Sequence, residues 1–106
     1  MTEKDTDEIR LPPFDEIFSF SARFNILLIL YVHQKIVFSK LQHLLNLTPG
    51  NLNHHLSKLS ENSFISIKKM FHSTRPISII HITEKGKESF AAYLVQFKDI
   101  LNDIEL

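Results

Sequence analysis

The stretch LNLTPGNLNHHLSKL, residues 45–59, decides the fold because it ends one helix and begins another within a few residues. Leucines keep helical spacing on both sides of the interruption at residues 46–48. Thr48 followed by Pro49 favours a helix start, since the threonine hydroxyl can accept from a free backbone N–H and proline has no N–H to leave unpaired. The stretch therefore predicts a helix from Pro49 to about Asn62.

The predicted helix has two chemically different faces. At about 100° per residue, Leu52, Leu56 and Leu59 fall on one side of it. Asparagine amides match adenine edges in the major groove of DNA, and lysine reaches phosphates, so a polar face of this kind can read DNA, although any surface helix also has a polar side. The face opposite the leucines carries Gly50, Asn51, His54, Ser57, Lys58 and Glu61.

A second short helix precedes this one. Ser39 can cap it, and Leu41, Leu44 and Leu45 follow the i, i+3, i+4 rule for a buried helix face. A short β-rich link, residues 36–38, comes just before it. Two short helices joined by a three-residue turn make a helix-turn-helix.

The chain before residue 34 has two parts. Residues 1–13 are polar and end in two prolines, so we expect a flexible N-terminal arm there. Residues 14–33 have a helical pattern but are apolar on nearly every side, with Ser21 as a candidate N-cap of the main segment. A helix that is apolar all round must be covered all round, and a second copy of the chain is the simplest second cover.

Two β-rich segments and a long helix follow the helix-turn-helix. Residues 64–71 and 77–83 predict a two-stranded wing, with residues 72–76 as its hairpin loop. Thr83 can then cap a last helix of residues 84–104, which at about 1.5 Å per residue is roughly 30 Å long and too long for one small core. Its 4, 3, 4, 3 spacing of apolar residues predicts pairing with another helix. These residues are Phe90, Leu94, Phe97, Leu101 and Ile104.

The composition limits the classes of function. A chain of 106 residues with 43% hydrophobic residues fits one domain, here residues 14–106. The lack of cysteine excludes disulfides, cysteine zinc sites and thiol catalysis, and favours a cytoplasmic location. The longest apolar run, residues 26–32, is far shorter than the roughly 20 residues that cross a bilayer, so we expect no membrane partner.

The charge is balanced over the chain but not along it. The net charge is zero, with 12 basic and 12 acidic residues, and alone gives no support for nucleic-acid binding. Acidic residues gather at the two ends, whereas residues 34–83 contain five lysines and Arg75 against the single acid Glu61. The middle of the chain is therefore a basic module.

Four segments of the chain match one family. They are ARFNIL (22–27), LTPGNLNHHLSKL (47–59), RP (75–76) and ITEKG (82–86). In this order they resemble the small bacterial and archaeal winged helix-turn-helix transcriptional regulators related to the MarR and ArsR groups. The resemblance spans about residues 14–94. It implies an α+β, mostly α fold and a homodimer, paired through the N-terminal and C-terminal helices, that binds double-stranded DNA and regulates transcription.

The candidate DNA contacts come from three elements. Arg75 suits the minor groove, where negative potential is focused. His55, at the edge of the leucine face, can equally brace the helix or touch DNA, and the sequence does not say which of Lys68 and Lys69 faces DNA, because neighbours on a strand point to opposite faces. The candidates are Lys40, Thr48, Gly50, Asn51, Asn53, His54, Ser57, Lys58, Thr74 and Arg75.

Metal chemistry and catalysis have little support. ArsR relatives sense metals, but here only histidines and carboxylates remain as ligands, and no two histidines have i, i+4 spacing. The chain has no glycine-rich phosphate loop and no H-E-x-x-H, so we expect no cofactor and no enzyme activity. The alternative to a DNA-binding regulator is a winged-helix module for protein–protein contact, which the neutral charge and the apolar first helix favour.

Overall fold

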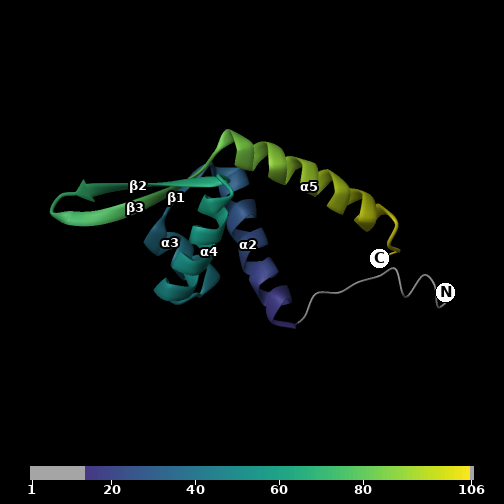
Figure 1. Ribbon diagram of the computed structural model, residues 1–106, viewed down its shortest axis with the longest axis horizontal. Coiled ribbons are helices and arrows are strands. Elements are labelled where there is room, and N and C mark those ends of the chain that lie inside the picture. The colour runs from purple at the N-terminus through teal and green to yellow at the C-terminus, as the bar shows by residue number, and fades with distance from the viewer. Residues whose placement is uncertain (1–13, 106) are drawn as a thin grey trace.

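The computed structural model describes residues 14–105, and side chains from residue 21 onward. The predicted flexible arm of residues 1–13 lies outside this part of the chain. The α+β, mostly α architecture with a wing and a long last helix is confirmed (Figure 1). In chain order the elements are α2 (Phe14–His33), β1 (Lys35–Val37), α3 (Phe38–Leu45), α4 (Pro49–Glu61), β2 (Ile65–His72), β3 (Arg75–Ile82) and α5 (Glu84–Asn102).

The sheet has three antiparallel strands in the order β1-β3-β2. β1 pairs with the inner end of β3, with Ile36 opposite Ile80, and β2 pairs with β3 along its whole length. The predicted β-rich link is thus a strand, one residue earlier than expected because Phe38 already begins α3. The wing therefore grows out of a three-stranded sheet rather than standing alone as a two-stranded hairpin.

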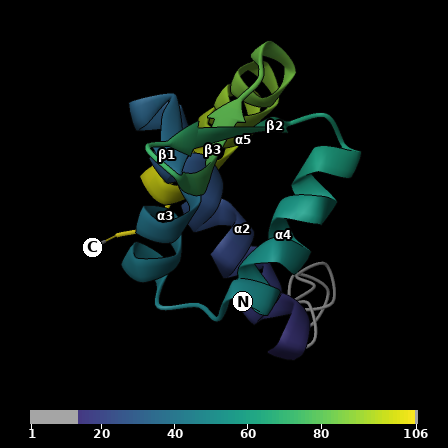
Figure 2. The same ribbon diagram turned by 90° about the vertical axis from the view of Figure 1, so that its left-hand side faces the viewer.

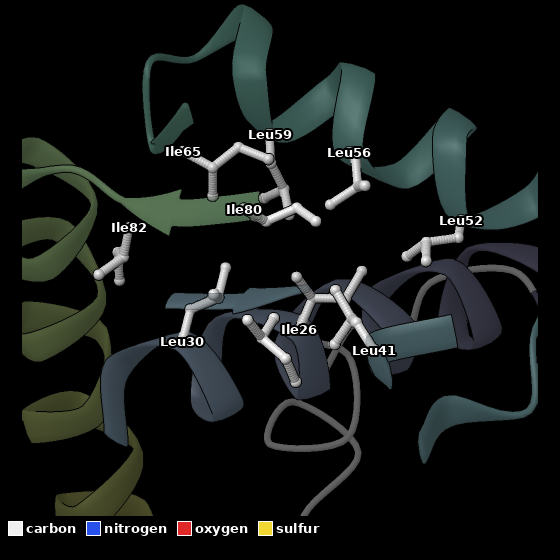
Figure 3. Packing of buried hydrophobic residues seen from close by; sticks show 10 residues of the cluster. Ile26, Leu30, Leu41, Leu52, Leu56, Leu59, Ile65, Ile80 and Ile82 are labelled. Carbon is white, nitrogen blue, oxygen red and sulfur yellow. The ribbon is translucent and has the colours of Figure 1, made fainter. Parts of the chain in front are cut away.

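The core lies between this sheet and the helices. Figure 3 shows Leu52, Leu56 and Leu59 pointing from α4 toward Ile26 and Leu30, with side chains of the sheet beside them. All five leucines and isoleucines are buried, which confirms the predicted apolar face of α4. Each buried side chain of this size contributes about 1.5–3 kcal/mol relative to exposure, so the packing fixes how α4 sits on the domain.

Two of the predicted helix caps are confirmed. The Thr48 hydroxyl accepts a hydrogen bond from the backbone N–H of Asn51 at 3.1 Å, and the Thr83 hydroxyl accepts one from the N–H of Gly86 at 2.9 Å. Asn46, in the left-handed conformation with φ 52°, ends α3 where the sequence predicted a break. The helix-turn-helix therefore has the boundaries that the turn residues favour.

The other two predicted caps are wrong. α3 begins one residue before Ser39, with Val37 at the N-cap position and no side-chain cap, because β1 holds the chain extended up to that point. Ser21 lies inside α2, which runs unbroken from Phe14. Residues 14–20 contain neither proline nor glycine, so nothing in them prevents the helix from starting earlier.

The wing is longer and its turn shorter than predicted. His72 still pairs with Arg75, so the turn is only Ser73 and Thr74, with Ser73 in the left-handed region at φ 59°. Pro76 lies in β3 beyond the part that β1 pairs, where the strand has a free edge and tolerates proline. The two strands therefore project as a narrow ribbon well past the core (Figure 1).

The wing and α5 leave the body of the domain in opposite directions (Figure 1). Their joint is tight. The Thr83 hydroxyl donates to the carbonyl of Ser63 at 2.6 Å, and its backbone N–H donates to the carbonyl of Phe64 at 3.0 Å. Gly86 is buried against Phe64, where a Cβ would collide with the Phe64 carbonyl oxygen and touch Ile82. The start of α5 is thus pinned to the base of the wing.

Candidate nucleic-acid interface

The polar face of α4 is open to solvent. Each of its predicted contact residues is exposed, while the leucine face is buried. Viewed along the wing, α4 descends from the sheet so that its N-terminal end projects away from the sheet (Figure 2). The first turns of the helix are therefore available to enter a groove. The exposed residues are Asn51, Asn53, His54, Ser57 and Lys58.

The N-terminal end of α4 combines a cap with open space. Thr48 is exposed while its hydroxyl oxygen caps the helix. A Cβ added at Gly50 would meet nothing within 4 Å, so this glycine is not required for packing. A smooth helix N-terminus with free N–H groups can approach an anionic backbone closely.

His55 braces α4 against the domain. Its side chain is buried, with 8% exposed, and its Nδ1 accepts a hydrogen bond from Nε of Arg23 on α2 at 3.4 Å. Burial lowers the pKa of His55, and the positive charge of Arg23 lowers it further. Both effects favour the neutral imidazole, whose Nδ1 accepts this hydrogen bond. Of the two roles that the sequence left open, the structure supports the bracing one.

The polar face of α4 carries little net charge. Nζ of Lys58 lies 3.9 Å from Oε2 of Glu61, one turn later, and both side chains are largely exposed. An exposed pair of this kind is worth little in stability, but it places a carboxylate beside the only lysine of the helix. Hydrogen-bonding groups rather than cations dominate this surface.

The other predicted contact residues lie on α3 and on the wing. Lys40 is exposed on α3, and Thr74 and Arg75 are exposed at the tip of the wing. The strand register shows which face of the ribbon each wing lysine occupies. Lys69 shares a face with the buried Ile65, and Lys68 lies on the opposite face. Both lysines are exposed because the ribbon extends past the core.

Other kinds of site are not evident in the part of the chain that the structure covers. Within residues 14–105 no three histidine, aspartate or glutamate side chains gather as metal ligands would. None of the described helices is long and apolar enough to span a membrane.

The family follows from the fold and the sequence together. The family model described as a winged helix DNA-binding domain matches residues 22–101, and the chain belongs to this family. This is a class of DNA-binding regulators, as the resemblance implied.

Particular relatives extend this result. An uncharacterized protein of Methanocaldococcus jannaschii is 40% identical over 90 residues, which cover 85% of this chain and 98% of the relative. The solved structure of a transcriptional regulator homologue from Pyrococcus horikoshii is 31% identical, with a TM-score of 0.76 over 81% of this chain and 85% of that one. A MarR transcriptional regulator from Methanosarcina mazei, 21% identical over 81% of this chain and 64% of that one, shares the fold with a TM-score of 0.62.

Sequence reasoning missed two residues of this region. Arg23 supports α4 through His55, but the two are 32 positions apart and no local pattern links them. The second missed residue is Phe71. The β-rich pattern of residues 64–71 predicted only that it lies in a strand, whereas its side chain is 73% exposed near the wing tip. An aromatic residue flanked by lysines and a turn was the only available signal.

Proposed function

We propose that this protein is a homodimeric transcriptional regulator that binds double-stranded DNA in a sequence-specific manner. The observation that carries the proposal is the exposed polar face of α4, in a chain of the winged helix DNA-binding family. Asn51 and His54 offer hydrogen-bond donors and acceptors that match base edges. Thr48 caps this helix and four further candidates lie on it, whereas Lys40 lies on α3 and Thr74 and Arg75 lie at the wing tip.

The dimer rests on the apolar side chains that one protomer leaves uncovered. Leu101 at the end of α5 and Ile104, just beyond it, are 41% and 47% exposed, and Leu28 and Val32 of α2 are exposed as well. The last helix thus ends at Asn102, two residues earlier than the sequence predicted. Exposed large apolar side chains on both helices are a feature of surfaces that a partner covers. In a dimer joined along α5 and α2, the two wings would lie at the outer ends, because each wing points away from α5 (Figure 1).

The two-fold axis of such a dimer determines the form of the target. Two α4 helices enter successive major grooves when they lie roughly 34 Å apart, so the target is an inverted repeat with half-sites about one helical turn apart. Within each half-site, Asn51 and His54 contact base edges and Lys40 contacts a phosphate. Arg75 reaches the flanking minor groove.

The test begins with duplexes selected from a random-sequence library by the wild-type protein. Fluorescence anisotropy then measures the affinity for a selected duplex and for its scrambled version over a range of salt concentrations. Asn51→Ala should reduce the discrimination between them by about 1–3 kcal/mol for each bidentate pair of hydrogen bonds that it removes. Lys40→Ala should weaken both equally and reduce the salt slope by about one ion per subunit. Ser60→Ala, exposed at the far end of α4, is the matched control and should behave as wild type.

A change at Glu61, beside Lys58, should increase the affinity for DNA instead of reducing it. Glu61→Gln removes the carboxylate beside Lys58, so it should strengthen binding to every duplex and steepen the salt dependence. If selection enriches no duplex, and Asn51→Ala and Lys40→Ala leave binding and salt slope unchanged, α4 does not read DNA. A winged-helix module for protein–protein contact is then the better account.

A further inference from the structure

The tip of the wing exposes an aromatic ring that the core does not need. Phe71 is 73% exposed, more than any other large hydrophobic side chain among the described residues. Pro76 lies directly opposite it on β3, and a single further pair, His72 with Arg75, separates them from the turn. The same face of β2 begins at the buried Ile65, becomes exposed at Ile67 and carries Lys69 before Phe71. Its apolar side chains therefore extend past the core, with one lysine among them.

The charges around this ring indicate what would cover it. Residues 62–83 contain no aspartate or glutamate, whereas Lys68, Lys69 and Arg75 lie on the ribbon. Within the described chain none of these three cations forms an ion pair. A ribbon with only positive charges around an exposed apolar ring best complements a partner that has only negative charges outside and apolar groups inside. A protein surface with charges of both signs complements it less well. Duplex DNA, with phosphates outside and stacked bases inside, has this composition.

The dimensions of the ribbon decide how it could enter a groove. A sheet with side chains on both faces is about 10 Å thick, whereas the minor groove of B-DNA is only about 6 Å wide. The tip carries Phe71 and Pro76 on one face and His72 and Arg75 on the other, so it cannot enter an undeformed groove. Proteins that enter this groove with apolar side chains widen it, partly unstack a base step and kink the duplex by roughly 20–90°.

We propose that the wing is a wedge: Phe71, backed by Pro76, inserts at a base step in the minor groove beside each half-site and kinks the DNA there. This proposal rests on the proposed DNA-binding function and adds how the wing contacts and deforms the DNA. Arg75 on the other face and Lys69 beside the ring hold the flanking phosphates. Flexible pyrimidine–purine steps, such as TA or CA, are the sites that such a wedge favours, so the flanks contribute to specificity without base-edge contacts.

The test measures binding and bending on one sample. A selected duplex carries a donor and an acceptor dye at its two ends, and 2-aminopurine replaces single adenines along the flanks. On binding, the wild-type protein should raise energy transfer between the ends and raise 2-aminopurine fluorescence at one step on each flank. Anisotropy of the same sample reports occupancy independently of bending.

Two variants on opposite faces of the ribbon form a matched pair. Phe71→Ala should still bind, with an affinity lower on the order of tenfold, but should leave the duplex straight and the 2-aminopurine quenched. Its salt slope should not change, because no phosphate contact is removed. Met70→Ala removes an exposed apolar side chain from the other face and should bend DNA as the wild type does. Both residues are exposed, so thermal melting should show both variants folded.

The outcomes separate the two proposals. Full occupancy with a straight duplex, or bending by Phe71→Ala equal to that of the wild type, overturns the wedge and leaves the DNA-binding function standing. Equally reduced bending in Met70→Ala and Phe71→Ala also overturns it, since the face of the ribbon would not matter. Absence of any anisotropy change with selected duplexes overturns both.

Discussion

The wing and α5 are two projections from one core, and their exposed apolar side chains sit among different charges. α5 carries three basic and three acidic residues, which leave it neutral. The wing carries Lys68, Lys69 and Arg75 with no acid. A neutral apolar helix face can pair with an identical face without repulsion, whereas an uncompensated cationic ribbon would repel its copy. The charge around an apolar patch thus distinguishes a surface for a second copy from a surface for a polyanion.

The largest effect is expected from breaking the α5 surface. Leu101→Glu with Ile104→Glu places two carboxylates in the proposed dimer seam, at positions exposed in a single protomer. The protomer should stay folded while the dimer dissociates, because each charge would be buried unpaired at a cost of several kcal/mol in the dimer only. Sedimentation velocity at micromolar concentration measures the change.

A control on the same helix makes this test specific. Val95, 61% exposed, lies on the opposite side of α5 from the seam, so Val95→Glu should remain dimeric. If the wild type is a stable monomer, or if Val95→Glu dissociates the dimer as fully as the double variant, the face with Leu101 and Ile104 is not the dimer interface.

The next largest effect concerns the joint between the two projections. Gly86→Ala places a methyl group against the Phe64 carbonyl and the Ile82 side chain, which cannot move without disturbing the base of the wing. Overpacking of this kind should reduce the free energy of unfolding by about 3 kcal/mol, measured by urea denaturation. A variant as stable as the wild type would mean that the joint is loose and that the wing and α5 are independent.

A smaller effect is expected from acidification, which tests the contact between His55 of α4 and Arg23 of α2 in the core that carries both projections. The folded protein holds the pKa of His55 below its ordinary value, so the unfolded chain binds a proton at higher pH than the folded one. Its contribution to stability is constant above about pH 6.5 and is lost as the pH falls from there toward the folded-state pKa. The free energy of unfolding should therefore decrease on acidification.

Comparison with His55→Gln isolates this residue from the other histidines. The glutamine oxygen can still accept from Arg23 but does not titrate. Urea unfolding at a series of pH values should show a shallower decline on acidification in the variant. Parallel curves for the two proteins would rule out His55 as the source.

The smallest effect is expected at the other glycine. Gly50→Ala adds a methyl group to open space in the first turn of α4, so it should stabilise the fold by about 0.4–1 kcal/mol by restricting the unfolded chain. The same methyl group stands where the helix end would approach DNA, so affinity should fall although stability rises. Urea denaturation and anisotropy measure the two changes, and a gain in both would place this end of α4 away from DNA.

Local chemistry in the sequence determined much of this protein. The turn at residues 46–49, the caps at Thr48 and Thr83, and the buried leucines of α4 follow from short-range hydrogen bonding and periodicity, and each prediction was confirmed. These features depend on neighbours within four residues, which can be read directly along the chain. The same reasoning placed the polar side chains on the exposed face of α4.

Only the tertiary structure decided the features that depend on distant partners. Pairing of β1 with β3 moved the start of α3 to Phe38, and pairing of β2 with β3 extended the wing through Arg75. Packing against Arg23 made His55 a brace, and the strand register put Lys69 and Phe71 on one face. Burial and register arise from contacts between segments that are far apart in the chain, so residue spacing alone could not determine them.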